Sequence, residues 1–396
     1  MHDVLIIGAR AAGASLALTL ARQGLKVLLI DRTDFPSDTM SGHYIHPAGV
    51  AALHRLGAGG VLTATAAPAQ RTVTVDFGPV VLSGTPAPAA DGTVEGYAPR
   101  RYIFDPLLCA TAVAAGAEFR PGMSFDEPLI DDDGRVTGIV AQDRDGRRVE
   151  LRACLVIGAD GKRSRFARKV GAAVYDARPA TSCCCYSYFS GMEVPGTRLH
   201  VRDGHFCIVT PTNDGLTFVA MAWPVGAFAR IKTDIGGALR DTAAGIPWVA
   251  ERLAAAQREE HFTGTADLDA FFRVPHGPGW ALVGDAGYHK DPITAQGMTD
   301  AFLHAELLAE AVIDGLSGRA PVDAALSRYH TRRDALARPL YELTCDLARL
   351  TPPAPEMTAA IGAMAADPVA TSRFLGVMSG TTSVAEVFGP PSAVAA

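Results

Sequence analysis

Short apolar runs alternate with segments rich in alanine and leucine along the N-terminal part of the chain. The first apolar run covers residues 4–7, a segment of helical composition covers residues 14–22, and a second apolar run covers residues 27–30. Runs of this length are too short for helices, and their separation by one helix is typical of a βαβ unit with parallel strands. The pattern therefore predicts an α/β fold that starts at the first residues.

The turn after the first apolar run carries the residue types of a dinucleotide-binding site. It reads Gly8-Ala9-Arg10-Ala11-Ala12-Gly13, and Asp31 follows the second run. Gly8 permits a tight turn, Gly13 permits close approach of helix and strand, and the free N–H groups of the helix attract a diphosphate. Asp31 is spaced to bind ribose hydroxyls. Arg10 stands where this pattern has its middle glycine, and its guanidinium could point outward or lie beside a diphosphate. An ordinary strand-turn-helix without a nucleotide remains the alternative.

Two later apolar runs also end in a glycine and an aspartate. Residues 151–157 lead into the turn of Asp160, and residues 280–283 lead into Gly284 and Asp285. A loop over residues 286–296 then precedes a helix that begins at Gly297. Open α/β sheets bind ligands at the carboxyl ends of their strands, and a helix N-terminus favours anions. Two such turns in one chain indicate one long ligand held between them.

The middle of the chain changes to strand-like alternation. We expect antiparallel strands over residues 181–192, 198–211 and 216–224, a hairpin over residues 73–82, and a helix over residues 238–256 interrupted at Pro247. A helix over residues 107–115 is predicted to have Asp105 as its cap and Pro106 at its first position. The sequence predicts a discontinuous dinucleotide-binding domain over residues 1–72, 97–175 and 275–345. A substrate-binding domain is expected over residues 73–96 and 176–274. A C-terminal helical segment is expected over residues 346–396.

Length, charge and cysteine content narrow the class of protein. A chain of 396 residues with 48% hydrophobic content is expected to form two domains. A net charge of −6 without a basic block argues against nucleic acid and anionic membranes as partners. We expect a cytoplasmic monomer or homodimer without a membrane span or a leader segment.

Seven cysteines, three of them adjacent, favour reduced thiols over disulfides. Neighbouring residues of a strand alternate faces, so Cys183 to Cys185 cannot bind one metal ion together, and no metal site is predicted.

Several polar residues in loops are candidates for a functional role. His43 and His46 lie in a loop rich in helix breakers, although histidines near a helix start are more often local hydrogen-bonding residues. His289 and Lys290 lie in the loop after Asp285, and we expect Lys290 to be solvated. Arg100 and Arg101 could bind a phosphate or form a solvated pair.

Taken together, the motifs at Gly8 to Gly13, Asp31, Arg100-Arg101, Asp160, and Gly284-Asp285 with Pro292 and Gln296-Gly297 resemble the FAD-dependent aromatic hydroxylases. These are the single-component flavoprotein monooxygenases of the para-hydroxybenzoate hydroxylase fold, and the resemblance covers residues 1–345. It implies a Rossmann-like FAD-binding domain, an inserted and mainly antiparallel substrate domain, and a C-terminal lid or packing arm. It also implies that FAD binds non-covalently. The residues it assigns to FAD are Gly8, Arg10, Ala12, Gly13, Asp31, Arg32, Arg101, Asp160, Gly284, Asp285, Gln296, Gly297 and Met298.

The resemblance also implies an activity. NAD(P)H would reduce the flavin as a transient co-substrate, O2 would form a C4a-hydroperoxide, and one oxygen atom would hydroxylate or epoxidise a small aromatic, polyketide or similar natural product. The candidate catalytic residues are His43, His289 and Pro292. Strand alternation suggests that the substrate contacts Cys183, Cys185, Tyr186, Tyr188, His205, Met221 and Trp223, although packing of the domain core is the alternative for about half of these.

Related chemistries share the cofactor motifs. An FAD-dependent reductase of the geranylgeranyl reductase type would need the same residues and differ in its use of oxygen. A non-catalytic flavin or NAD sensor would keep the nucleotide motifs alone. The WxWxIP motif and early lysine of flavin-dependent halogenases are not visible, since the nearest segment reads Met221-Ala222-Trp223-Pro224.

Overall fold

A computed structural model describes residues 1–389, and the N-terminal strands form a mixed sheet with a parallel centre. The strand order is β17-β18-β8-β1-β2-β5, and β7 pairs antiparallel with β8 and β6. The central strands are buried on both faces, which is why their sequences are continuous apolar runs. The strands are β1 (His2–Ile7), β2 (Val27–Asp31), β5 (Glu118–Pro121), β6 (Ser124–Ile130), β7 (Val136–Gln142), β8 (Arg148–Gly158), β17 (His276–Gly277) and β18 (Trp280–Leu282). The predicted α/β fold is confirmed.

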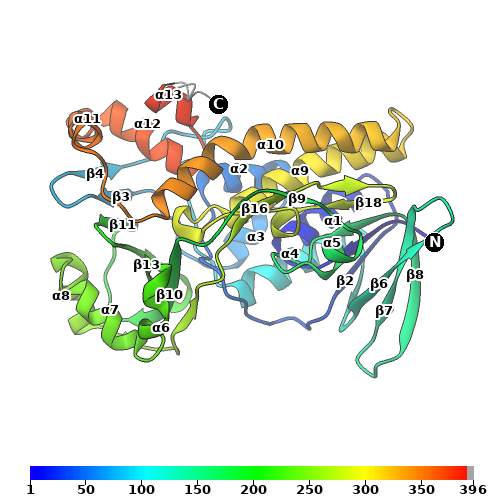
Figure 1. The fold of residues 1–396 in the computed structure, drawn as a ribbon, viewed down its shortest axis with the longest axis horizontal. Coiled ribbons are helices and arrows are strands. Elements are labelled where there is room, and N and C mark those ends of the chain that lie inside the picture. The colour runs from blue at the N-terminus through cyan, green and yellow to red at the C-terminus, as the bar shows by residue number, and fades with distance from the viewer. Residues whose placement is uncertain (390–396) are drawn as a thin grey trace.

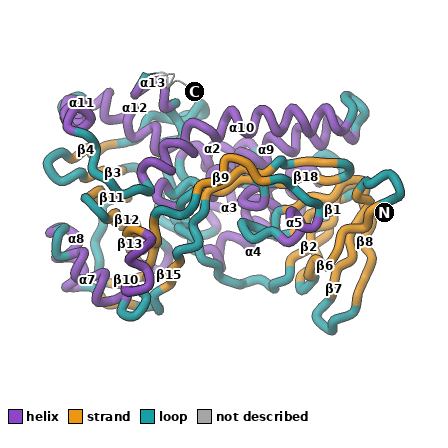
Figure 2. Tube along the Cα trace, in the orientation of Figure 1, coloured by secondary structure: helices purple, strands orange, loops and turns teal. Residues whose placement is uncertain are grey.

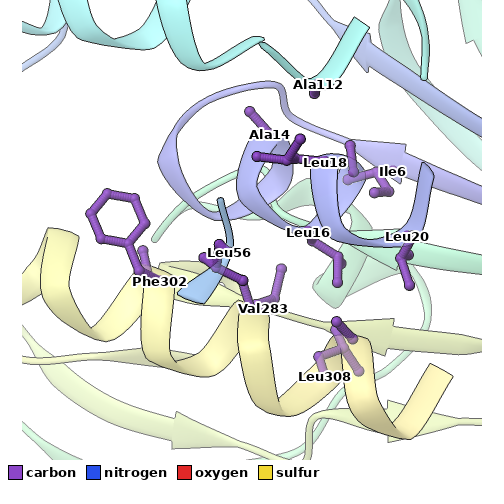
Figure 3. Packing of buried hydrophobic residues seen from close by; sticks show 14 of the residues in the cluster. Ile6, Ala14, Leu16, Leu18, Leu20, Leu56, Ala112, Val283, Phe302 and Leu308 are labelled. Atoms are coloured by element: carbon purple, nitrogen blue, oxygen red, sulfur yellow. The ribbon is translucent and has the colours of Figure 1, made fainter. Parts of the chain in front are cut away.

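Helices cover one face of this sheet. Side chains of α1 and α9 meet over the sheet, where Leu16 and Leu20 lie near Val283 and Leu308 (Figure 3). The other face is covered by α5 and by the arm of β6 and β7, which projects from the sheet together with the first residues of β8 (Figure 2). The helices are α1 (Ala11–Arg22), α2 (Pro47–Arg55), α3 (Gly59–Ala64), α4 (Arg101–Ala114), α5 (Arg165–Lys169), α9 (Gly297–Leu316) and α10 (Val322–Leu347).

A second sheet joins segments that are far apart in the chain. Its order is β14-β10-β13-β12-β11-β3-β4, with β15 paired to β10. A parallel pairing of β3 with β11 brings residues 73–76 beside residues 197–200. The strands are β3 (Val73–Asp76), β4 (Val81–Gly84), β10 (Ser182–Ser190), β11 (Thr197–Arg202), β12 (His205–Pro211), β13 (Thr217–Pro224), β14 (Gln257–Arg258) and β15 (Thr263–Thr265). A small third sheet contains β9 (Val174–Arg178), β16 (Ala270–Arg273) and β19 (Tyr288–His289).

The two faces of the second sheet are covered by different helices. One face packs against α6 (Phe228–Ile231), α7 (Ile235–Ala243) and α8 (Pro247–Ala255). The other face packs against α11 (Pro355–Ala365) and α12 (Pro368–Ser379), which with α13 (Val384–Phe388) lie above β3 and β4 in Figure 1. From α12, Phe374 and Leu375 are buried against this sheet. The C-terminal helices therefore form part of the core that includes the second sheet.

The start of α4 differs from the sequence prediction. The helix begins at Arg101, six residues before the predicted start, and Pro106 lies inside its first two turns. Asp105 is therefore a helical residue and not a cap. Its carboxylate is fully buried and accepts hydrogen bonds from two arginine side chains. Pro106 is the sixth residue of the helix, so the helix lacks the hydrogen bond that an N–H at this position would donate to the carbonyl of Tyr102.

Residues 1–389 contain no helix of the length and apolar character needed to cross a membrane.

Candidate functional site

The carboxyl ends of three parallel strands meet where the glycine motifs lie. The Ala159 amide donates to the carbonyl of Ile7 at 2.8 Å, and the Val283 amide donates to the carbonyl of Gly158 at 3.0 Å. These bonds hold the turns after β1, β8 and β18 at one edge of the sheet. The sequence motifs separated by up to about 270 residues thus form one site at the position where open α/β sheets bind ligands.

The first turn has no room for side chains at its two glycines. A Cβ atom at Gly13 would lie 1.8 Å from the carbonyl oxygen of Gly8. Gly8 has φ of 106°, in the left-handed region that favours glycine, and a Cβ there would lie 2.4 Å from the carbonyl oxygen of Ala159. The close contact of α1 with β1 points the free amides of the helix at the edge of the sheet. This geometry fits a diphosphate at the N-terminus of α1.

Asp31 and Arg10 flank this turn. The Asp31 carboxylate accepts a hydrogen bond from the Ala9 amide at 2.8 Å and lies at the end of β2, where a ribose would bind. The Arg10 guanidinium donates to Asp105 at 2.7 Å and to the hydroxyl of Ser37 at 3.0 Å. Arg101 donates to the other oxygen of Asp105 at 2.9 Å. The side chain of Arg10 therefore links the start of α1 to α4 and to the loop after β2. Its backbone forms part of the glycine turn that precedes α1. Arg32 is exposed.

The second turn lies against the first. A Cβ atom at Gly284 would approach the side chain of Ala12 to 2.8 Å, which brings the turn after β18 against the start of α1. Asp285 and Gly297 are exposed, and the space around Gly297 is open, whereas Met298 is buried. The N-terminus of α9 and a free carboxylate thus face the same edge as the first turn. Together the two turns fit an extended dinucleotide such as FAD.

Asp160 has a local structural role through its side chain. Its carboxylate accepts hydrogen bonds from the Ser164 hydroxyl at 2.6 Å and from the amides of Arg165 at 2.9 Å and Phe166 at 3.2 Å. These bonds hold the turn that leads into α5, and burial raises the pKa of the carboxyl group. The predicted contact of Asp160 with FAD or NAD(P)H would therefore involve the exposed part of the turn.

His43, Tyr188 and Arg100 form a buried group beside the loop that precedes α9. His43 Nε2 is hydrogen-bonded to the Tyr188 hydroxyl, and the Arg100 guanidinium lies 3.7 Å from the centre of the Tyr188 ring. The rings of Tyr186 and Phe218 pack around this pair, with centroids 5.0 Å apart. These aromatic residues share a core cluster with Ile293. The loop of His43 and strand β10 of the second sheet thus meet next to the predicted flavin loop.

The environment sets the protonation states of this group. Burial, with the positive charges of Arg101 and Arg100, holds the pKa of His43 well below its usual value. Burial also raises the pKa of Tyr188, although Arg100 opposes this. His43 is therefore a neutral imidazole and Tyr188 a neutral phenol at physiological pH.

Residues of the loop before α9 are more constrained than the sequence suggested. Lys290 was expected to be solvated, but its side chain is buried and its ammonium group donates to Tyr288 at 3.0 Å and is paired with Asp300. The apolar surroundings explain this pairing, because a buried ammonium needs a counter-charge. The His289 ring is hydrogen-bonded to the carbonyl of Asp269 at 2.7 Å. Pro292 is exposed, and Gln296 is buried with its amide donating to the carbonyl of Met378 in α12.

The structure separates the residues predicted to contact the substrate. Tyr186 and Tyr188 lie on the face of the second sheet that packs with Ile293. Cys183, Cys185, Met221 and Trp223 lie on the opposite face and pack against α6 to α8. Their joint placement in one pocket was wrong, because odd and even positions of β10 point to opposite faces. His205 begins β12 at the turn after β11 and pairs with Arg202.

Comparison with known proteins agrees with this cofactor site. A family model described as "FAD binding domain" matches residues 1–264. The chain belongs to this FAD-binding family. Digeranylgeranylglycerophospholipid reductase 1 of Methanopyrus kandleri is 26% identical over 370 residues, which cover 88% of the chain and 90% of the reductase. The protein is accordingly an FAD-dependent oxidoreductase.

Solved structures show that the fold extends over nearly the whole chain of this family member. The flavin-dependent brominase Bmp2 superposes with a TM-score of 0.82, at 19% identity, over 97% of this chain and 95% of the brominase. PqsL, a probable FAD-dependent monooxygenase from Pseudomonas aeruginosa, superposes with a TM-score of 0.72, at 21% identity, over 94% of this chain and 98% of PqsL. At these identities the likeness concerns the fold alone.

Sequence reasoning missed the contacts of Arg100 and Lys290. Arg100 was considered a phosphate ligand or a solvated residue, yet its side chain is buried and bridges Asp38 at 3.1 Å and Glu260 at 2.7 Å. These partners come from separate segments of the chain, and no local spacing connects them. The adjacency of two arginines before a helix was the one available signal, and it did not show that both side chains would be buried.

Proposed function

We propose that the protein is an FAD-dependent monooxygenase that uses NAD(P)H and O2 to oxygenate a small, planar organic molecule. The observation that carries this proposal is the buried group of His43, Tyr188 and Arg100 beside the loop of Ile293. Its aromatic rings suit a planar substrate, and its polar atoms suit a substrate with oxygen groups. A long polyprenyl chain would instead need an extended apolar surface.

The residues of the two turns would hold the cofactor. Gly8, Gly13 and the N-terminus of α1 would bind the diphosphate, Asp31 the ribose, and Asp285 a hydroxyl of the ribityl chain. Bound FAD would supply the redox and oxygen chemistry, and the protein would supply binding, orientation and exclusion of water. Ile293, Phe374 and the rings around Tyr188 would exclude water from the substrate side. NAD(P)H would bind transiently near the turn of Asp160.

A second candidate is an FAD-dependent reductase of carbon–carbon double bonds. The reductase of Methanopyrus kandleri named above favours it, because the likeness extends over most of both chains. This candidate uses the same cofactor residues and needs no oxygen.

Turnover with labelled dioxygen tests the proposal against this alternative. Purified protein should contain FAD, and candidate aromatic and polyketide substrates should accelerate NAD(P)H oxidation at least about tenfold, which corresponds to about 1.4 kcal/mol in the barrier. Mass spectrometry should then find one labelled oxygen atom in the product. Equal product formation under anaerobic conditions would instead identify a reductase.

A further inference from the structure

A cavity of about 340 Å³ lies beside α7 and α8, away from the turns that would hold the cofactor. Its volume falls within the range of about 300–1,000 Å³ that is usual for small-molecule sites. Five of its lining residues are apolar and come from β10, from α7, from α8 and its C-cap, and from the segment after β14: Phe189, Leu239, Leu253, Ala256 and Phe262.

The second sheet separates this cavity from the aromatic group around Tyr188. Phe189 packs with residues of α6 to α8, whereas the neighbouring Tyr188 packs on the opposite face with Ile293. This division follows from the strand, because consecutive side chains point to opposite faces. A ligand in the cavity would therefore occupy a site distinct from that of the proposed substrate.

The apolar lining of the cavity is only partly covered by the protein. Phe189 and Leu239 are buried, but the other three apolar side chains remain partly exposed. At Gly236 in α7, a Cβ atom would lie 3.2 Å from the ring of Phe262, so the glycine allows this ring to lie close to the helix. An apolar chain in the cavity would remove this lining from water, which favours binding.

Two exposed arginines complete the lining. Arg240 lies in the last turn of α7, and Arg258 lies in β14. The guanidinium of Arg258 lies 4.7 Å from the centre of the Phe262 ring. One terminal nitrogen of Arg240 lies 3.5 Å from the position that a Cβ atom would take at Gly236. Both positive groups therefore border the apolar part of the cavity.

Carboxylates close to these arginines in the chain have other partners. Asp234 caps the N-terminus of α7, Glu259 is hydrogen-bonded to a serine hydroxyl of β10, and Glu260 is paired with the buried arginine before α4. Within residues 1–389, neither Arg240 nor Arg258 forms an ion pair with a carboxylate. The cavity thus combines an apolar lining with two positive charges that lack a counter-charge, which is complementary to an anion with an apolar tail.

We propose that this cavity binds a free carboxylic acid with an unbranched apolar chain of medium length. The chain lies against Phe189, Leu239 and Leu253, and the carboxylate lies between Arg240 and Arg258. This site goes beyond the proposed function, because its residues take no part in holding the flavin or the substrate.

Calorimetric titration of the FAD-containing protein with octanoate tests the proposal. Octanamide has the same chain without the charge and should bind at least about fivefold more weakly, which corresponds to about 1 kcal/mol. Propionate keeps the carboxylate but lacks most of the chain, so it should bind at least about tenfold more weakly. The titrations require low ionic strength, because salt screens exposed charges.

Substitutions locate the carboxylate and the chain. The double variant Arg240→Gln with Arg258→Gln should bind octanoate about fivefold more weakly and octanamide as before, so that the preference for the acid disappears. Ala256→Phe places a ring in the cavity and should weaken the binding of both compounds. The matched control is Arg230→Gln, which removes an exposed arginine of α6 that does not line the cavity and should leave both affinities unchanged.

Unchanged octanoate affinity in the double variant or in Ala256→Phe would overturn the proposal. Absence of octanoate binding to the wild-type protein, equal affinity for octanamide, or an equal loss in Arg230→Gln would do the same. The melting temperature and FAD absorbance of each variant show whether it has folded. These outcomes are independent of the proposed function, whose failure would appear as product without label from dioxygen.

Discussion

Gly13 has no space for even one added carbon atom. In Gly13→Ala the new methyl group would meet the carbonyl of Gly8, and because that atom belongs to the backbone, α1 would have to move away from β1. We expect the variant to lose at least about 2 kcal/mol of unfolding free energy and most of its FAD, in line with overpacking of a close contact. Thermal melting and the flavin absorbance of the purified variant measure the two effects.

Gly60→Ala provides the matched control. Gly60 lies in α3, and a Cβ atom there meets nothing within 4 Å. The same substitution should therefore leave FAD content unchanged and stabilise the helix slightly, by up to about 1 kcal/mol. A Gly13→Ala variant that melts like this control would contradict the close contact of α1 with β1.

Single residues of the site differ in how far the sequence could predict them. Gly8, Gly13, Asp31 and Asp285 were recognisable because each follows a strand at a spacing set by local geometry. The pairing of His43 with Tyr188 was not, since these residues are 145 positions apart and meet only when the second sheet docks beside the loop after β2. Residue type and spacing indicate a cofactor turn, but packing of distant elements decides which polar groups come together.

At the scale of elements, α4 is attached to α1 through one carboxylate. Asp105 is fully buried and forms ion pairs with Arg10, at the start of α1, and with Arg101, in its own helix. Asp105→Asn should destabilise the protein by about 3–5 kcal/mol, because two largely buried guanidinium groups lose their counter-charge. Urea unfolding of the FAD-free protein gives this value.

Arg10→Gly tests the same connection from the other side. This substitution restores the more usual glycine, yet we expect weaker FAD binding and faster proteolysis in residues 35–41, because the bonds from Arg10 to Asp105 and Ser37 are lost. If instead FAD binds more tightly, Arg10 merely obstructs the diphosphate and does not organise the loop.

Strands and helices were predicted more reliably than their faces. The antiparallel strands β10, β12 and β13 lie where the sequence pattern placed them, yet the residues predicted to contact the substrate are divided between the two faces of the sheet. Both faces of this sheet are covered by helices, so apolar residues occupy odd and even positions alike. The alternation of apolar and polar residues, which normally distinguishes the core face of a strand from its solvent face, therefore does not identify the two faces of this sheet.

For the molecule as a whole, buried neutral histidines should make stability depend on pH. Burial lowers the pKa of His46 to about 4, although its hydrogen bond to the carbonyl of Thr294 opposes this, and the pKa values of His43 and His304 also lie well below the usual value. Between pH 6.5 and about 4 the unfolded chain binds protons that the folded protein does not, so stability falls as pH falls. His46 alone contributes up to about 3 kcal/mol over this interval.

His46→Gln should reduce this dependence, since its amide can still donate to the carbonyl of Thr294 but does not titrate. Melting temperatures at a series of pH values between 7 and 4 measure the slope, and His54→Gln, at a half-exposed position, should leave it unchanged. Buried carboxyl groups such as those of Asp160 and Asp291 have raised pKa values and oppose the effect in both proteins. Identical slopes in wild type and His46→Gln would contradict the role of His46.

The parallel pairing of β18 with β8 has a consequence for biosynthesis. The central sheet receives β18 from residues 280–282, and α9, which covers α1, comes later still. During translation, the N-terminal segment that contains β1 and β8 therefore leaves the ribosome before β18 and α9 have been synthesised. Until then, its apolar strands and one face of α1 remain exposed. Nascent chains shorter than about 320 residues should be the forms that chaperones bind, and FAD would be captured only after most of the polypeptide has emerged.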